Sequence, residues 1–214
     1  MTGNRNPESV SHYYNSCLSA ANDVGCGYGW KTSAHQKVTA RTHNSRNYLV
    51  WEDGDGTEHF FDWSGSQPYK DCEGMELEMS FNSAGTKIFI YDKGHNGLRF
   101  NVLQAGLAWL EATTDAHGNI STYSYVSGYE KEGRLDKITD CTNRVTQFAY
   151  DSNGMLSSIR IPAAADNSYR YVYYTYDSTK RLTGVRYSEL GGTAPHTTYG
   201  YDGSTNLLTK VRNY

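Results

Sequence analysis

The chain lacks several features that mark common classes of protein. No apolar run approaches the roughly 20 residues of a membrane-crossing helix, so the sequence predicts no membrane span. The 20 basic residues are scattered among 23 acidic ones. Without a basic stripe, nucleic acid is not an expected partner. With only 4 prolines against 21 glycines, frequent tight turns are expected and disorder is not.

Cysteine is also scarce. None of the four residues, Cys17, Cys26, Cys72 and Cys141, forms a Cys-x-x-Cys pair, so a zinc site is not predicted. A Cys17–Cys26 disulfide is possible in an oxidising compartment, and four free or buried thiols are the preferred interpretation. We expect no metal and no cofactor.

What the chain has in abundance is tyrosine. Its 19 tyrosines raise the aromatic content to 14%. A tyrosine combines an apolar ring with a polar tip, so such a chain can bury surface although its composition is polar. Together with the valine, isoleucine and threonine content and recurring Gly/Asn/Asp pairs, this favours strands and hairpins.

The second half of the chain contains a repeat. Tyr-Asp pairs follow one another at intervals of 25 or 26 residues, and each tyrosine has another aromatic two positions before it. Residues i and i+2 of a strand share a face, so each copy presents two rings on one side. The aromatics and acids are Tyr123 and Tyr125 in a degenerate first copy, then Phe148, Tyr150 and Asp151, then Tyr174, Tyr176 and Asp177, then Tyr199, Tyr201 and Asp202.

A leucine follows each pair after a few turn-forming residues, and a β-branched residue lies three positions beyond it. These leucines are Leu156, Leu182 and Leu208, with Leu135 in the degenerate copy. Each repeat is therefore predicted to be a β-hairpin whose aspartate accepts hydrogen bonds from its own turn. A lone hairpin is marginal in water, whereas adjacent hairpins bury their rings together. Residues that recur in this way are interpreted as structural, and no catalytic residue is proposed.

The first half is also β-like but has no such period. Residues 48–51 and 57–61 flank Glu52-Asp53-Gly54-Asp55-Gly56, which indicates a hairpin. The segment 102–112 suits a strand or bend somewhat better than a helix. We expect an antiparallel all-β protein built as a curved sheet of successive hairpins, with an N-terminal β region at 1–114 and the hairpin array at 115–214.

The repeat resembles the Rhs/YD-repeat family, whose pattern is roughly G-x-x-x-x-Y-x-Y-D-x-x-G-R-L-x-x-V. The segments that carry the resemblance are Gly118 to Leu135, Phe148 to Leu156, Tyr174 to Leu182 and Tyr199 to Leu208, and earlier Tyr14-Asn15-Ser16, Gly27-Tyr28-Gly29-Trp30 and Asp53 to Phe60. His12 stands where an arginine is common in the family.

This resemblance implies a piece of a larger secreted or cell-surface bacterial protein, similar to wall-associated proteins, polymorphic toxins, Tc-toxin cocoons and teneurins. It implies a β-shell that encloses or presents a C-terminal effector, with the remainder of the parent chain and that effector as partners. It also implies a structural scaffold and not an enzyme. An exposed sheet edge after Tyr214 would allow self-association.

The main alternative is a carbohydrate- or cell-wall-binding module with glycans as partners. Exposed aromatic rings suit sugar faces, and the residues to follow are Trp30, Trp51, Trp63 and Trp109.

A hydrolase would need converging acid and base groups, and the seven histidines form no recognisable triad. Asp53 to Gly56 fits a hairpin turn better than a calcium loop, because Ser64 stands where that loop needs a glutamate. The Glu76/Glu78 pair fits a solvated strand face better than a glycosidase.

Overall fold

The computed structural model describes residues 10–18, 24–163 and 168–214. It is an all-β protein with antiparallel sheets of successive hairpins, which confirms the predicted fold class. A single 3-10 turn in the described residues, η2 (Ser188–Leu190), follows β16. The strands are β1 (His12–Tyr14), β2 (Trp30–Thr32), β3 (Lys37–His43), β4 (Arg46–Glu52), β5 (Glu58–Asp62), β6 (Tyr69–Lys70), β7 (Glu78–Phe81), β8 (Lys87–Tyr91), β9 (Gly97–Gln104), β10 (Leu107–Thr114), β11 (Ile120–Tyr125), β12 (Leu135–Thr139), β13 (Val145–Tyr150), β14 (Leu156–Pro162), β15 (Tyr169–Tyr176), β16 (Leu182–Tyr187), β17 (Thr197–Tyr201) and β18 (Leu208–Asn213).

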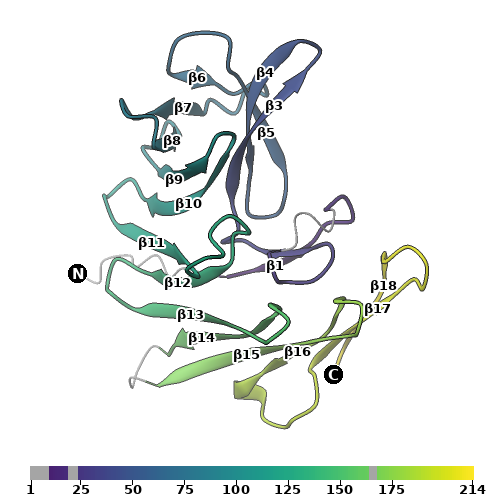
Figure 1. The fold of residues 1–214 in the computed structure, drawn as a ribbon. Helices are drawn as coiled ribbons and strands as arrows, with labels where there is room; N and C mark the ends of the chain where they lie inside the picture. Colours follow the sequence, from purple (N-terminus) through teal and green to yellow (C-terminus); the bar gives the residue numbers. More distant parts are fainter. Residues whose placement is uncertain (1–9, 19–23, 164–167) are drawn as a thin grey trace.

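The main sheet has 16 strands, and those from β6 to β18 lie in chain order. A branch of β3, β4 and β5 joins it through β10, which pairs with β3. The sheet bends along its length, and the two-stranded β1–β2 sheet lies on its inner side (Figure 1). Pairing between β10 and β11 carries the sheet across residues 114 and 115 without a break. The ambiguous segment 102–112 is extended in β9 and β10.

The strand register explains the spacing of the repeat. In each hairpin the first aromatic lies opposite the β-branched residue, and the second tyrosine lies opposite the leucine. The two aromatics are two positions apart, whereas the leucine and its β-branched partner are three apart. One register shift per hairpin absorbs the extra residue, as a β-bulge does, and keeps all four side chains on one face. The pairs are Tyr123↔Ile138 and Tyr125↔Leu135, Phe148↔Ile159 and Tyr150↔Leu156, Tyr174↔Val185 and Tyr176↔Leu182, and Tyr199↔Val211 and Tyr201↔Leu208.

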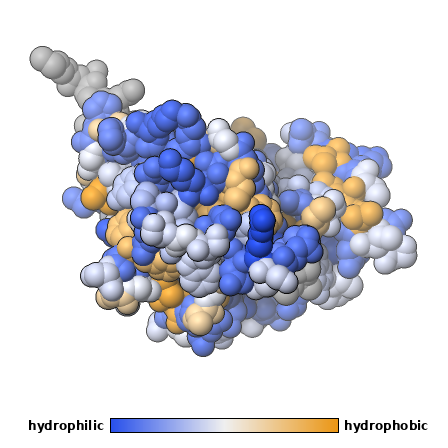
Figure 2. Space-filling view, turned by 90° about the horizontal axis from the view of Figure 1, so that it is seen from above, coloured by the Kyte–Doolittle hydropathy of each residue, from blue (hydrophilic) through white to orange (hydrophobic). Residues whose placement is uncertain are grey.

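The core lies on the inner face of this bent sheet. Leu135, Leu156 and Leu182 are at most 1% exposed, and burial of each stabilises the fold by about 1.5–3 kcal/mol. Burial decreases at the last hairpin, where Leu208 is half-buried and Val211 is 54% exposed. Seen from above, the surface is largely hydrophilic, and its apolar residues form separate patches (Figure 2).

Candidate functional site

The aspartate of each Tyr-Asp pair closes its own hairpin turn. Asp177 Oδ1 accepts the backbone N–H groups of Thr179 and Arg181 at 2.9 and 3.0 Å, while Oδ2 accepts Arg181 Nε at 2.7 Å. Burial alone would raise the pKa of Asp177, but these bonds from Arg181 and Thr179 lower it to about 2. Asp151 and Asp202 accept backbone N–H groups of their turns in the same way. The three aspartates are therefore turn-formers, and Asp177 remains ionised at neutral pH.

The same device recurs at turns other than those of the repeated Tyr-Asp pairs, one of which follows a further such pair, Tyr91-Asp92. Asp92, Asp115 and Asp140 each accept the backbone N–H of the residue four positions later. In these turns the residue at the third position after the aspartate has a positive φ, as at Asn143 with φ 63°. An Asp-x-x-(Gly/Asn/His)-x pattern between strands is the signal that could have revealed these turns.

The second tyrosine of a repeat links its hairpin to the preceding one. The Tyr125 hydroxyl donates to the Leu110 carbonyl at 2.6 Å, the Tyr176 hydroxyl to the Leu156 carbonyl at 3.0 Å, and the Tyr201 hydroxyl to the Leu182 carbonyl at 2.6 Å. Burial raises the pKa of Tyr125 and Tyr201, to about 12 in the latter. These hydroxyls are therefore neutral donors. We call the eight inner-face aromatics of the repeats, from Tyr123 to Tyr201, the aromatic ladder.

Tyr150 is the exception within the ladder. Its hydroxyl is buried near the Leu135 backbone and has no hydrogen-bond partner of normal geometry in the described part of the chain. Burial raises the pKa of Tyr150, so the unpaired group stays protonated. This position therefore offers a natural comparison for the three tyrosines that do form the link.

The segment at residues 24–30 runs across the ends of the repeat hairpins. The Leu156 N–H donates to the Gly25 carbonyl at 2.7 Å, and the Tyr28 N–H donates to the Lys180 carbonyl at 3.4 Å. A Cβ placed on Gly25 would lie 2.9 Å from the Gly154 carbonyl oxygen, and one on Gly27 would lie 3.0 Å from that of Lys180. Both glycines have positive φ, so the crossing requires glycine for its backbone shape and for its close approach.

Trp30 anchors this segment on the last repeat. Its indole N–H donates to the Tyr201 hydroxyl at 2.8 Å, and its ring contacts the Tyr199 ring at a centroid distance of 4.7 Å. The Tyr14 hydroxyl accepts the Leu208 N–H at 2.9 Å, and His12 bonds the Tyr174 hydroxyl. The inner face of the last two repeats is therefore covered by residues that precede it by about 160 or more positions in the chain.

The four tryptophans divide between the interior and the surface. Trp30 and Trp109 are 6% and 4% exposed, and Trp109 packs against Tyr125 at 6.1 Å. Trp51 is half-buried, while Trp63 is 40% exposed. The four do not form one exposed aromatic face.

Sequence reasoning missed a set of buried charged side chains that come from β2, β3 and β4. Lys31 is 2% exposed, and its Nζ donates to Glu52 Oε1 at 2.8 Å; Lys37 reaches the other oxygen of that carboxylate at 3.0 Å. Burial lowers the pKa of Lys31 although Glu52 opposes the change. His35, 1% exposed, lies nearby, and burial lowers its pKa to about 3. The sequence does not indicate that these lysines and this histidine are buried, because burial of such side chains depends on partners that only the tertiary structure brings close.

The other sites considered from the sequence have local structural roles. Cys17, Cys72 and Cys141 are free and exposed, whereas Cys26 is buried. Asp53 Oδ1 accepts three N–H groups of its Gly-rich turn, from Asp55 to Thr57. Glu76 pairs with Lys93 on the surface, and Glu78 is exposed.

His59 joins two loops of the N-terminal region. Its Nε2 lies 3.1 Å from Asp53 Oδ2 and its Nδ1 lies 2.9 Å from Glu73 Oε2. Burial would lower the pKa of His59, but these two carboxylates raise it overall. The ring also contacts Trp51 at a centroid distance of 4.8 Å.

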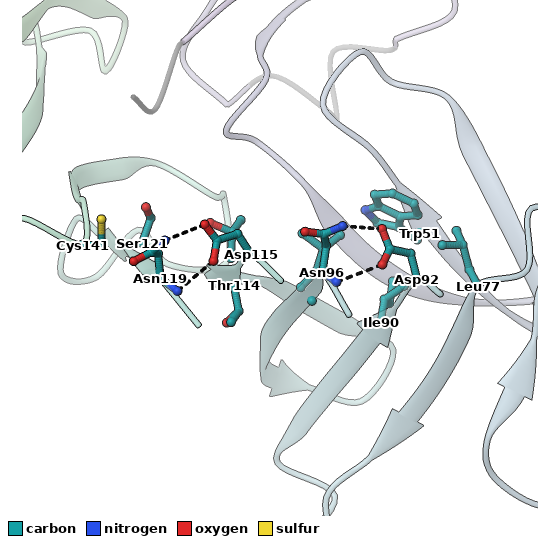
Figure 3. Close-up of a pocket in the computed structure, with 13 residues that line it drawn as sticks. Trp51, Leu77, Ile90, Asp92, Asn96, Thr114, Asp115, Asn119, Ser121 and Cys141 are labelled. Carbon is teal, nitrogen blue, oxygen red and sulfur yellow. Dashed lines mark hydrogen bonds between the residues drawn. The ribbon is translucent and has the colours of Figure 1, made fainter. Parts of the chain in front are cut away.

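A cavity of about 320 Å³ lies where several turns meet, outside the ladder. It is lined by the apolar side chains of Trp51, Leu77, Ile90 and Leu98, by two Asp/Asn turns and by Ser121 and Cys141. Figure 3 shows Trp51 and Leu77 beside Asp92 at one end of the cavity and Cys141 at the other. Neither the repeat nor any motif pointed to this cavity, because its residues come from β4, β8, β9, β10 and β11 and from adjoining turns.

Comparison with protein-family models and with curated proteins found no match. Within the described ranges, no helix is long and apolar enough to cross a membrane. The same residues contain no group of three or more histidine, cysteine, aspartate or glutamate side chains arranged to hold a metal ion.

Proposed function

We propose that this chain is a structural segment of a secreted or cell-surface protein of the Rhs/YD-repeat type, and that it contributes a stretch of β-shell which helps to enclose or present an effector domain. The observation that carries the proposal is the hydrogen bond from a ladder tyrosine to the preceding hairpin. This hydrogen bond joins each hairpin to the preceding one through a side chain, in addition to the pairing of their strands. The recurring tyrosine of each repeat then serves the assembly of the sheet.

The position of the N-terminal segment refines this proposal. Trp30 packs on the inner face at Tyr199 and Tyr201, and Gly25 and Gly27 cross the ends of the hairpins, so that part of the face is already in contact with the chain's own residues. An effector would therefore be held by further strands of the parent protein, or beyond the N-terminal segment, and not directly on the aromatic ladder.

Burial of two tryptophans supports the scaffold over the glycan-binding module. Trp30 and Trp109 pack against ladder tyrosines and are removed from any ligand. The carbohydrate-binding alternative is favoured by one observation only, the position of Trp51 in the wall of the cavity.

The proposal is tested by locating the protein and its partners in its source cells. An epitope inserted between Gly191 and Gly192, where the chain is exposed, leaves the ladder intact. We expect the tag in the secreted or surface fraction, within a protease-resistant assembly that also contains a second, protected domain. Recovery as a free cytoplasmic chain with no protected companion would contradict the proposal. A second insertion at the exposed Gly65 controls for effects of the tag itself.

A further inference from the structure

The cavity beside Trp51 has the features of a ligand site. Its volume of about 320 Å³ falls at the lower end of the range of about 300–1,000 Å³ that small-molecule sites occupy. Trp51 contributes an aromatic surface, and Leu77 and Leu98 extend the apolar wall. His59 packs against the indole at 4.8 Å, and the indole N–H donates to Gln36 at 3.1 Å. The ring is therefore held in place before any ligand arrives.

The polar side chains of the cavity are equally fixed. Asp92 Oδ2 accepts the side-chain amide of Asn96 at 2.8 Å, and Asp115 Oδ2 accepts that of Asn119 at 2.7 Å. The Asn96 carbonyl oxygen in turn accepts the Ala116 N–H at 3.1 Å, which joins the two turns directly. Figure 3 shows both pairs side by side along the cavity. Such preorganisation reduces the entropy lost on binding.

The charge of the cavity selects the kind of ligand. The Asn96 and Asn119 side chains lower the pKa of Asp92 and Asp115 respectively, so both carboxylates are ionised at neutral pH. Among the described residues that line the cavity, none is a lysine, arginine or histidine. A ligand that brings a positive charge would meet two carboxylates and an aromatic ring, which attracts cations through its face.

We infer that this cavity binds an amino sugar with a free ammonium group. The ammonium would lie between Asp92 and Asp115, and one face of the pyranose would lie against Trp51. Its hydroxyls would bond Asn96, Asn119 and Ser121. The site is independent of the ladder, so it adds a binding function to the proposed scaffold without relying on it.

Cys141 provides the assay, because this exposed thiol lines the cavity while the exposed Cys17 and Cys72 do not. Alkylation of each cysteine is followed by mass spectrometry with increasing glucosamine. We expect glucosamine at low-millimolar concentration to slow modification of Cys141 several-fold and to leave Cys17 and Cys72 unchanged. Glucose, which has a hydroxyl in place of the ammonium, and N-acetylglucosamine, which lacks the charge, should be at least tenfold weaker.

Two variants distinguish the effect of the cavity's negative charge on binding from the effect of a substitution on the fold. Asp115→Asn should weaken glucosamine binding about tenfold, whereas Asp151→Asn, in a similar turn that does not line the cavity, should leave it unchanged. The change in tryptophan fluorescence of the wild-type protein on addition of glucosamine, which should be lost in Trp51→Phe, gives a second readout if an aspartate variant does not fold. Equal protection by glucose, or no protection by glucosamine at high-millimolar concentration, would overturn the inference. Protection by Ca²⁺ that excludes glucosamine would also overturn it, since the site would then be a cation site.

Discussion

Acidification should destabilise this protein through His35, a buried histidine that cannot take up a proton without disrupting its surroundings. The ring is 1% exposed, and its Nδ1 accepts the Thr32 N–H at 3.3 Å and lies 2.8 Å from Thr32 Oγ1. Its Nε2 is buried without a hydrogen-bond partner among the described residues. Burial first, and then the charges of Lys31, His12 and Lys37, lower its pKa to about 3.

The sign and size of the effect follow from linkage. The unfolded chain binds a proton at His35 below about pH 6.5, whereas the folded protein does not until about pH 3. Stability is therefore fully present above pH 6.5 and is lost as the pH falls toward 3. At pH 5 the loss from this one residue is about 2 kcal/mol, since each pH unit below 6.5 contributes about 1.4 kcal/mol. That is a large fraction of a typical folding free energy of about 5–15 kcal/mol.

The measurement is urea unfolding of the wild type and of His35→Asn at pH 7 and pH 5. Asparagine keeps an acceptor for Thr32 but does not titrate. We expect the wild type to lose about 2 kcal/mol more than the variant between the two pH values. The comparison cancels other groups that titrate in this window, including His12, whose pKa burial lowers to about 4. His43→Asn, at an exposed position, is the matched control and should behave as the wild type. Equal losses in the wild type and in His35→Asn would refute the reasoning.

Three further outcomes are expected. Tyr125→Phe should lower the free energy of unfolding, measured in urea, by about 1–2 kcal/mol because it removes a buried hydrogen bond. Tyr150→Phe should change that free energy by less than about 0.5 kcal/mol. Equal losses in the two variants would show that the hydrogen bond to the preceding hairpin is not stabilising. Gly27→Ala should cost about 3 kcal/mol in the same assay, against about 1 kcal/mol for Gly128→Ala, which has positive φ but open space around it. As the pH rises from 6 to 8, loss of the proton from His59, whose folded pKa is raised, should speed hydrogen exchange in the loop around Glu73, measured after correction for the intrinsic rate. His59→Gln should abolish that pH dependence, and a dependence that persists in the variant would assign it to another group.

Much of the hairpin array could be predicted because its signals are local. The Tyr-x-Tyr-Asp spacing places two rings on one face, and the aspartate closes a turn with N–H groups two and four residues away. The acceptor of each tyrosine hydroxyl could not be predicted in this way, because it belongs to the neighbouring hairpin. The register shift before Tyr176 was likewise implicit in the Leu-x-x-Val spacing but became visible only with the strand pairing.

The cavity and the buried charges were beyond prediction for a related reason. Asp92 and Asp115 belong to separate turns, and they meet Trp51 only because the β3–β5 branch joins the main sheet through β10. No repeat or motif connects these residues, so their common wall is a product of topology.

The sequence by itself determined that the chain forms successive antiparallel hairpins, because turn chemistry and a period of about 25 residues act over short distances. Only the tertiary structure decided what covers their inner face. Trp30 bonds Tyr201 across 171 positions, and Gly25 and Gly27 cross hairpins more than 120 positions away. Such contacts depend on the bend of the whole sheet, since it is this bend that brings the N-terminal segment and the distant repeats to the same face.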